Sequence, residues 1–118
     1  MRLYKLFLVI PVALVLILGS FACSSATTSD FTVASSVDFN HSHDVTIKGA
    51  DIDNPPANPV TITSTATGAT PHTHTIVLSQ ADYQSIKDGK TVSIVSSPFP
   101  ANNHTHTFNI KKPTTGSY

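Results

Sequence analysis

The stretch HTHTFNI at residues 104–110 decides how this chain is expected to fold. Successive side chains of a β-strand point to opposite faces, so residues two apart share a face. His104 and His106 therefore share a face with Phe108 and Ile110, while the threonines and the asparagine face the other way. The pattern predicts a strand whose apolar face is buried. It also predicts that the two histidines continue that buried face.

The same pattern occurs twice more, as HSHDVTI at residues 41–47 and HTHTIVL at residues 72–78. Successive histidine pairs begin 31 and 32 residues apart along the chain. Each pair follows a β-branched, Ser/Thr-rich run and a link rich in Gly, Pro or Asn. A fixed period of this kind indicates an internal repeat. Two such runs joined by turn residues predict a β-hairpin, so the sequence predicts three related hairpins.

Two connectors complete the predicted domain. Residues 51–59 are rich in proline and asparagine and predict a loop. Residues 79–89 are the one helix candidate, because Ser79 with Asp82 resembles a capping box and Gly89 provides a stop. The predicted fold is all-β: a small antiparallel sandwich or barrel of three pseudo-repeated hairpins with one short helix.

The N-terminus has the features of an export signal. Arg2 and Lys5 precede an apolar run of 13 residues at 6–18. A helix needs about 20 apolar residues to span a bilayer, so this run predicts a signal peptide instead. The run leads to Cys23, which is the only cysteine in the sequence.

Cys23 and the preceding Ala22 resemble the lipobox of bacterial lipoproteins. Ser20 and Phe21 depart from that motif, which prefers an aliphatic and then a small residue there. The resemblance implies that Cys23 is lipidated and becomes the mature N-terminus. It also implies anchoring in the outer or cytoplasmic membrane, facing the periplasm or the exterior. Ordinary cleavage after Ala22 or Ala26, giving a secreted protein, is the alternative.

The expected divisions of the chain are a signal peptide at 1–22, the lipidated cysteine and a flexible tether at 23–30, a His-rich β domain at 31–112 and a tail at 113–118.

The composition of the chain limits the classes of partner that are expected. The formal net charge is zero and the sequence contains no glutamate. There is no basic stripe of the kind that binds nucleic acid, so nucleic acid is not expected as a partner. The expected partners are a metal ion and, through the lipid, a membrane.

The three His-x-His pairs are the candidate ligands of a metal ion, and they use every histidine in the chain. A neutral imidazole binds a cation through a ring nitrogen, and two histidines at i and i+2 of a strand lie on the same side. The candidate ligands are His41, His43, His72, His74, His104 and His106. Two alternatives involve no metal. The histidines are solvent-exposed if the strand register slips by one residue, or they form a core network with serine hydroxyls such as those of Ser35, Ser64 and Ser96.

The expected cofactor is a divalent transition metal. The mature domain offers no cysteine or methionine ligand apart from Cys23, which disfavours Cu(I), and lacks the carboxylates that calcium and magnesium prefer. All-nitrogen ligation suits zinc, copper(II) or nickel, with zinc and copper expected first. Three or four histidines make a tetrahedral zinc site, and six make an octahedral site.

The sequence therefore predicts an exported cell-envelope protein that captures, buffers or delivers zinc or copper. One alternative is a zinc-dependent hydrolase or lyase with three histidine ligands. Its resemblance to carbonic anhydrases is confined to the His-x-His tripeptide. No convincing general base is visible, which favours binding over catalysis. The other alternative is a structural surface protein whose fold the metal stabilises. The mature domain also resembles uncharacterised small exported bacterial proteins with similar His-Thr-His strands, and that resemblance implies no activity.

Overall fold

The structure, a computed structural model, describes residues 27–114. The predicted signal peptide, Cys23 and the last four residues of the tail lie outside the described residues. The chain forms six strands and two helices in this order: β1 (Phe31–Ala34), β2 (Asp44–Ile47), α1 (Gly49–Asp53), β3 (Val60–Thr63), β4 (Thr75–Leu78), α2 (Gln80–Lys87), β5 (Val92–Val95) and β6 (Thr107–Ile110).

The six strands form three antiparallel hairpins, β1-β2, β3-β4 and β5-β6. The register is the same in each, because the first residue of one strand faces the last residue of its partner. The equivalent pairs are Phe31 with Ile47, Val60 with Leu78, and Val92 with Ile110. The prediction of an all-β fold built from three pseudo-repeated hairpins is confirmed.

Backbone hydrogen bonds join each hairpin to the next. Just beyond the first strand of each hairpin, an amide donates to a carbonyl at the second strand of the preceding hairpin. These bonds, all 2.8 Å long, run from Ser36 to Thr107, from Thr65 to Asp44 and from Ser97 to Thr75. The hydroxyls of Ser36, Thr65 and Ser97 accept return bonds of 2.9 Å from the amides of Thr107, Asp44 and Thr75. The third hairpin thus returns to the first, and the three close into a ring with pseudo-threefold symmetry.

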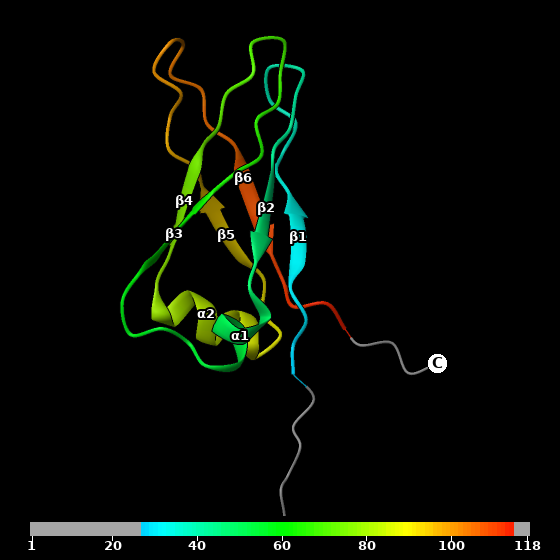
Figure 1. Cartoon of the computed structure of the whole chain (residues 1–118), viewed down its shortest axis with the longest axis vertical. Helices are drawn as coiled ribbons and strands as arrows, with labels where there is room; N and C mark the ends of the chain where they lie inside the picture. The colour runs from blue at the N-terminus through cyan, green and yellow to red at the C-terminus, as the bar shows by residue number, and fades with distance from the viewer. Residues whose placement is uncertain (1–26, 115–118) are drawn as a thin grey trace, which may run out of the picture.

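The core lies inside this ring. The second strand of each hairpin buries two alternating apolar side chains, each at most 1% exposed: Val45 and Ile47, Ile76 and Leu78, and Phe108 and Ile110. Ile52 of α1 and Tyr83 and Ile86 of α2 are fully buried against them. In Figure 1 both helices lie at one end of the hairpins and the three hairpin loops lie together at the other.

The helices follow local sequence signals to different degrees. The capping box of α2 is present, with Ser79 and Asp82 bonded reciprocally, and Gly89 follows with a φ of +80°. The start of the region predicted to be a loop instead belongs to α1, a single turn. Burial of Ile52 against the core explains this turn, since proline and asparagine dominate only the residues that follow it. Tertiary contact therefore decides the conformation there.

The first described residues are held against α1. The amide and hydroxyl of Thr28 donate to the carboxylate of Asp53 at 2.8 and 2.6 Å. The amide of Gly49 donates to Asp30 at 2.9 Å. Between residues 27 and 114, neither helix has the length and apolar character needed to cross a membrane.

Candidate metal centre

All six predicted histidines lie at the loop end of the ring, in two layers. The second histidine of each pair precedes the buried apolar residues of its strand. These inner histidines, His43, His74 and His106, are at most 1% exposed. The outer histidines, which are His41, His72 and His104, lie one step nearer the loops. His104 is buried, whereas His41 and His72 are half-buried. The prediction that the histidines continue the core face is confirmed, and the register-slip alternative is wrong.

The imidazole rings are arranged as an octahedron. Each ring lies 4.7 to 5.2 Å, centroid to centroid, from every other ring except one. The excepted partners are opposite one another: His41 and His74, His43 and His104, and His72 and His106. This is the pattern of corners in a trigonal antiprism, with the inner histidines on one triangular face and the outer histidines on the other.

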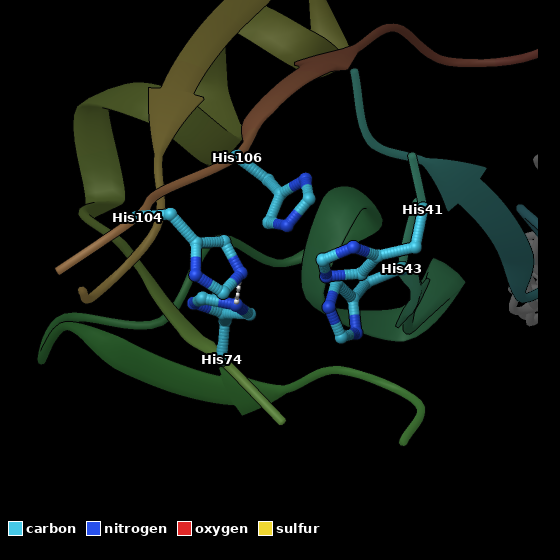
Figure 2. A group of neighbouring side chains, drawn as sticks. All are labelled: His41, His43, His74, His104 and His106. Atoms are coloured by element: carbon cyan, nitrogen blue, oxygen red, sulfur yellow. Dashed lines mark hydrogen bonds between the residues drawn. The ribbon is translucent and has the colours of Figure 1, made fainter. Parts of the chain in front are cut away.

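The Nε2 atoms converge on the middle of this arrangement. Nε2 of His72 lies 3.1 Å from Nε2 of His104 and 3.3 Å from Nε2 of His41. Nε2 of His74 lies 3.3 Å from that of His104. Apart from His72, the histidines each offer one nitrogen within 4.8 Å of the others' nitrogens. Figure 2 shows these five rings grouped around a common centre.

The inner histidines are oriented by the neighbouring hairpin. Each Nδ1 donates to a backbone carbonyl just beyond the first strand of another hairpin. The bonds run from His43 to Thr65 (2.7 Å), from His74 to Ser97 (2.7 Å) and from His106 to Ser36 (3.1 Å). The inner rings are therefore held by the carbonyls of the same three residues whose amides join the hairpins.

The outer histidines are oriented by their own loops. Each Nδ1 donates to an oxygen two residues earlier in the chain. The acceptors are the carbonyl of Phe39 for His41 (3.0 Å), the carbonyl of Thr70 for His72 (2.8 Å) and the side-chain oxygen of Asn102 for His104.

These partners fix the tautomer of every ring. A carbonyl oxygen only accepts hydrogen bonds, so each Nδ1 carries the proton and each neutral ring has a lone pair on Nε2. Six lone pairs then face one another, and nitrogens 3.1 to 3.3 Å apart have no proton to share. Nε2 of His43 and Nε2 of His106 are buried without any hydrogen-bond partner. A central cation would satisfy all six lone pairs. Ligating histidines characteristically donate their other ring nitrogen in this way.

The serine network expected as an alternative is present, but it serves other atoms. The hydroxyls of Ser35, Ser64 and Ser96 accept from the backbone amides of the inner histidines at 2.9 to 3.0 Å. The same hydroxyls lie 3.3 to 3.4 Å from inner Nδ1 atoms. None of these contacts reaches an Nε2 atom. The serine hydroxyls therefore contact the Nδ1 side of the inner rings and make no hydrogen bond to the Nε2 atoms.

The surroundings favour neutral imidazoles. Burial lowers the pKa values of His43, His74 and His104 below the ordinary value, because the charged ring is poorly solvated there. Repulsion from neighbouring histidines lowers these pKa values further, although the carbonyl bonds to His43 and His74 act in the opposite direction. A neutral ring is the form that binds a metal.

Among the described residues, the cluster that could ligate an ion consists of histidines alone. The carboxylate of Asp38 lies 3.6 Å from Nδ1 of His106, on the side of the ring away from the centre. Asn102 and the backbone carbonyls that orient the rings were not among the predicted site residues. A usable signal exists for the outer layer, since each acceptor stands two residues before its histidine.

The outer face of the cluster opens to a cavity of about 390 Å³ formed by the hairpin loops. Its lining includes the outer histidines, Gly68, and two phenylalanines that contact them. Phe99 stacks on His72 with ring centroids 4.1 Å apart, and Phe39 lies 5.0 Å from His104. Gly68 has a φ of +98°, and a Cβ there would lie 3.4 Å from the rings of His41 and His72. The loops therefore leave a route from solvent to the outer face.

Comparisons with protein-family models, with curated proteins and with solved structures find no match to this chain.

Proposed function

We propose that this protein is an exported metal-binding protein of the cell envelope that captures, buffers or delivers a divalent transition metal ion. The observation that carries the proposal is the convergence of six Nε2 lone pairs, two of them buried without a partner. Leaving buried polar atoms unsatisfied costs about 1 to 3 kcal/mol each. An ion at the centre removes that cost and gives the cluster a function.

The donor set is consistent with zinc and copper(II), the ions expected from the sequence, and also with nickel(II). Neutral nitrogen ligands suit all three. Protons compete for the same nitrogens, so metal affinity falls in acid.

Binding is favoured over hydrolysis because of where the outer histidines lie. A catalytic zinc held by the three inner histidines needs an open fourth position for water. The outer histidines occupy that direction. The carboxylate of Asp38 lies 3.6 Å from Nδ1 of His106, on the side of that ring away from the centre. Lipidation at Cys23, with the short segment after it as a tether, would keep the domain at a membrane surface.

The test is metal content and affinity of the untagged chain from Ser24 to Tyr118. Elemental analysis and competitive titration with zinc and copper(II) are compared between the natural sequence and a His72→Ala/His74→Ala variant. Thr73→Ala is the matched control, because Thr73 lies between these histidines and is exposed. Stoichiometric binding by the natural sequence and the control, and its loss in the double variant, supports the proposal. A folded protein with no affinity tighter than about 0.1 mM overturns it.

A structural role for the metal is the second candidate. Each hairpin contributes two of the six histidines, so an ion at their centre would cross-link all three hairpins. The rate at which the bound ion exchanges with a chelator distinguishes the two roles. Transfer of the ion to a competing chelator within minutes, with the domain remaining folded, indicates capture or delivery. Release of the ion only when the domain unfolds indicates a structural role.

A further inference from the structure

We infer that the site takes its ion in octahedral coordination by all six Nε2 atoms, and that it therefore selects an ion with an octahedral preference, nickel(II) foremost, over zinc. This inference rests on the proposed function and specifies its ligand. It also makes the bound ion coordinatively saturated.

The first argument is the size of the cluster. Adjacent corners of a regular octahedron are separated by √2 times the distance from the centre to a corner. For the four histidines whose Nε2 separations are 3.1 and 3.3 Å, division by √2 gives a distance of about 2.2 to 2.3 Å from nitrogen to centre. Zinc–imidazole bonds are about 2.0 to 2.1 Å long. The Nε2 atoms of His41, His72, His74 and His104 therefore already stand close to bonding distance from one central ion. The ligand atoms of His43 and His106 lie within 4.8 Å of those of His41, His74 and His104.

The second argument concerns four-coordination. Any four corners of an octahedron include at least one opposite pair, whereas a tetrahedral ion has no opposite ligands. Tetrahedral zinc would therefore require at least one ring to move. Each ring is held by its Nδ1 hydrogen bond, either to another hairpin or to its own loop. Movement would break such a bond or displace a loop.

The third argument is symmetry and electron count. Octahedral nickel(II), with eight d electrons, gains a large ligand-field stabilisation and suits equivalent ligands. Zinc has a filled d shell and gains none. Copper(II) prefers a tetragonal site with two long axial bonds. One elongated axis would make the three hairpins inequivalent, although their hydrogen bonds to the histidines are equivalent. The threefold arrangement therefore reduces the usual advantage of copper.

Saturation has a functional consequence. Six nitrogen ligands leave no position for water or substrate, so the bound ion is cargo or a structural element. Exchange must begin at the outer face, where the loops and the 390 Å³ cavity give access. The inner face is closed by the core below it.

The test uses the untagged chain loaded separately with nickel(II), cobalt(II) and zinc. X-ray absorption of the nickel form is expected to show six nitrogen neighbours, and cobalt(II) is expected to give the weak visible bands of a six-coordinate ion. Equimolar competition is expected to load nickel over zinc. Intense cobalt bands typical of a tetrahedral ion, or four nitrogen neighbours around nickel, overturn the inference while leaving the proposed function intact. If none of the three ions binds, the inference is overturned, and if copper(II) does not bind either, the proposed function is overturned as well.

Six single His→Ala variants provide a second readout. If all six rings ligate, each variant lowers nickel affinity by about 100-fold or more, since even partners that merely orient a ligand matter 10- to 100-fold. Thr105→Ala, an exposed position between two of the histidines, is the matched control and keeps the natural affinity. Two or more histidine variants with natural affinity, in proteins whose circular dichroism shows them folded, overturn six-fold coordination.

Discussion

The inner and outer histidines present the same atom to the same centre, yet they are held in different ways. The inner rings donate to carbonyls of a neighbouring hairpin and are almost completely buried. The outer rings donate to oxygens two residues away in their own loops, and two of them are half-buried. This difference shows that the inner histidines help to join the three hairpins without any metal, whereas the outer histidines are held only within their own loops.

The largest effect is expected from substituting one histidine of each layer. His74→Ala and His72→Ala should both lower metal affinity by about 100-fold or more. Without metal, His74→Ala should also lower the free energy of unfolding by about 2 kcal/mol, because it opens a buried space and removes the hydrogen bond from the ring to the carbonyl of Ser97. His72→Ala should change it by less than about 0.5 kcal/mol. Chemical denaturation with a chelator present measures this, and equal losses would contradict the two-layer distinction.

Metal loading should remove the difference between the layers. An ion bound to both layers links all three hairpins, so at 100 times Kd it should raise the free energy of unfolding by about 2.7 kcal/mol. For a domain of this size, the rise in Tm is about 10 to 20 °C. Thermal unfolding with and without nickel measures it. Thr105→Ala should show the same rise and His104→Ala/His106→Ala none. A rise that persists in the double variant would place the ion elsewhere.

Damage at the helix end should separate fold stability from metal affinity. A Cβ on Gly49 would lie 1.8 Å from the carbonyl oxygen of Thr28, so Gly49→Ala forces the first described residues away from α1. The expected loss is about 2 kcal/mol of unfolding free energy. Nickel affinity at 20 °C should stay within about twofold, because no histidine touches that region. Ala50→Ser, at the exposed neighbouring position, is the control. A large loss of affinity in folded Gly49→Ala would show that the helix end controls the site.

Asn102 allows a smaller test of the outer layer alone. Its side-chain oxygen is the acceptor for Nδ1 of His104, and Asn102→Ala leaves that ring without its orienting partner. Metal affinity should fall by about tenfold with little change in stability. Competitive titration measures the change against Ala101→Ser as control. Unchanged affinity would mean that packing against Phe39, 5.0 Å away, suffices to orient the ring.

The smallest effect is a pH dependence at the helix end. The hydroxyl and amide of Thr28 hold the pKa of Asp53 below its ordinary value of 3.8. A depressed folded-state pKa adds stability above the ordinary pKa that is lost as pH falls through the folded value. Asp53→Asn should therefore be less stable than the natural sequence at neutral pH and approach it at low pH. Denaturation of the metal-free protein between pH 2 and 6 tests this, and parallel curves would exclude the contribution.

The alternation of apolar and polar residues along the chain predicted much of the fold. Residues 104–110 and their two counterparts predicted the second strand of each hairpin, and Val45, Ile76 and Phe108 are buried as the alternation requires. Ser79 and Asp82 predicted α2 through a local hydrogen-bonded motif. The turn at residues 49–53 was missed, because Ile52 is drawn into helical structure by burial against residues distant in sequence. Local patterns cannot report such a contact.

The sequence by itself determined which side chains share a face and that six histidines continue the core, because alternation along a strand is a local property of the backbone. Only the tertiary structure decided that the three histidine pairs meet. That meeting depends on hydrogen bonds such as Ser36 to Thr107, which join residues 71 positions apart in sequence and close the hairpins into a ring. The same closure supplies the carbonyls that set the tautomers of the inner histidines. No spacing along the chain encodes those partners, since they belong to whichever hairpin lies beside the ring.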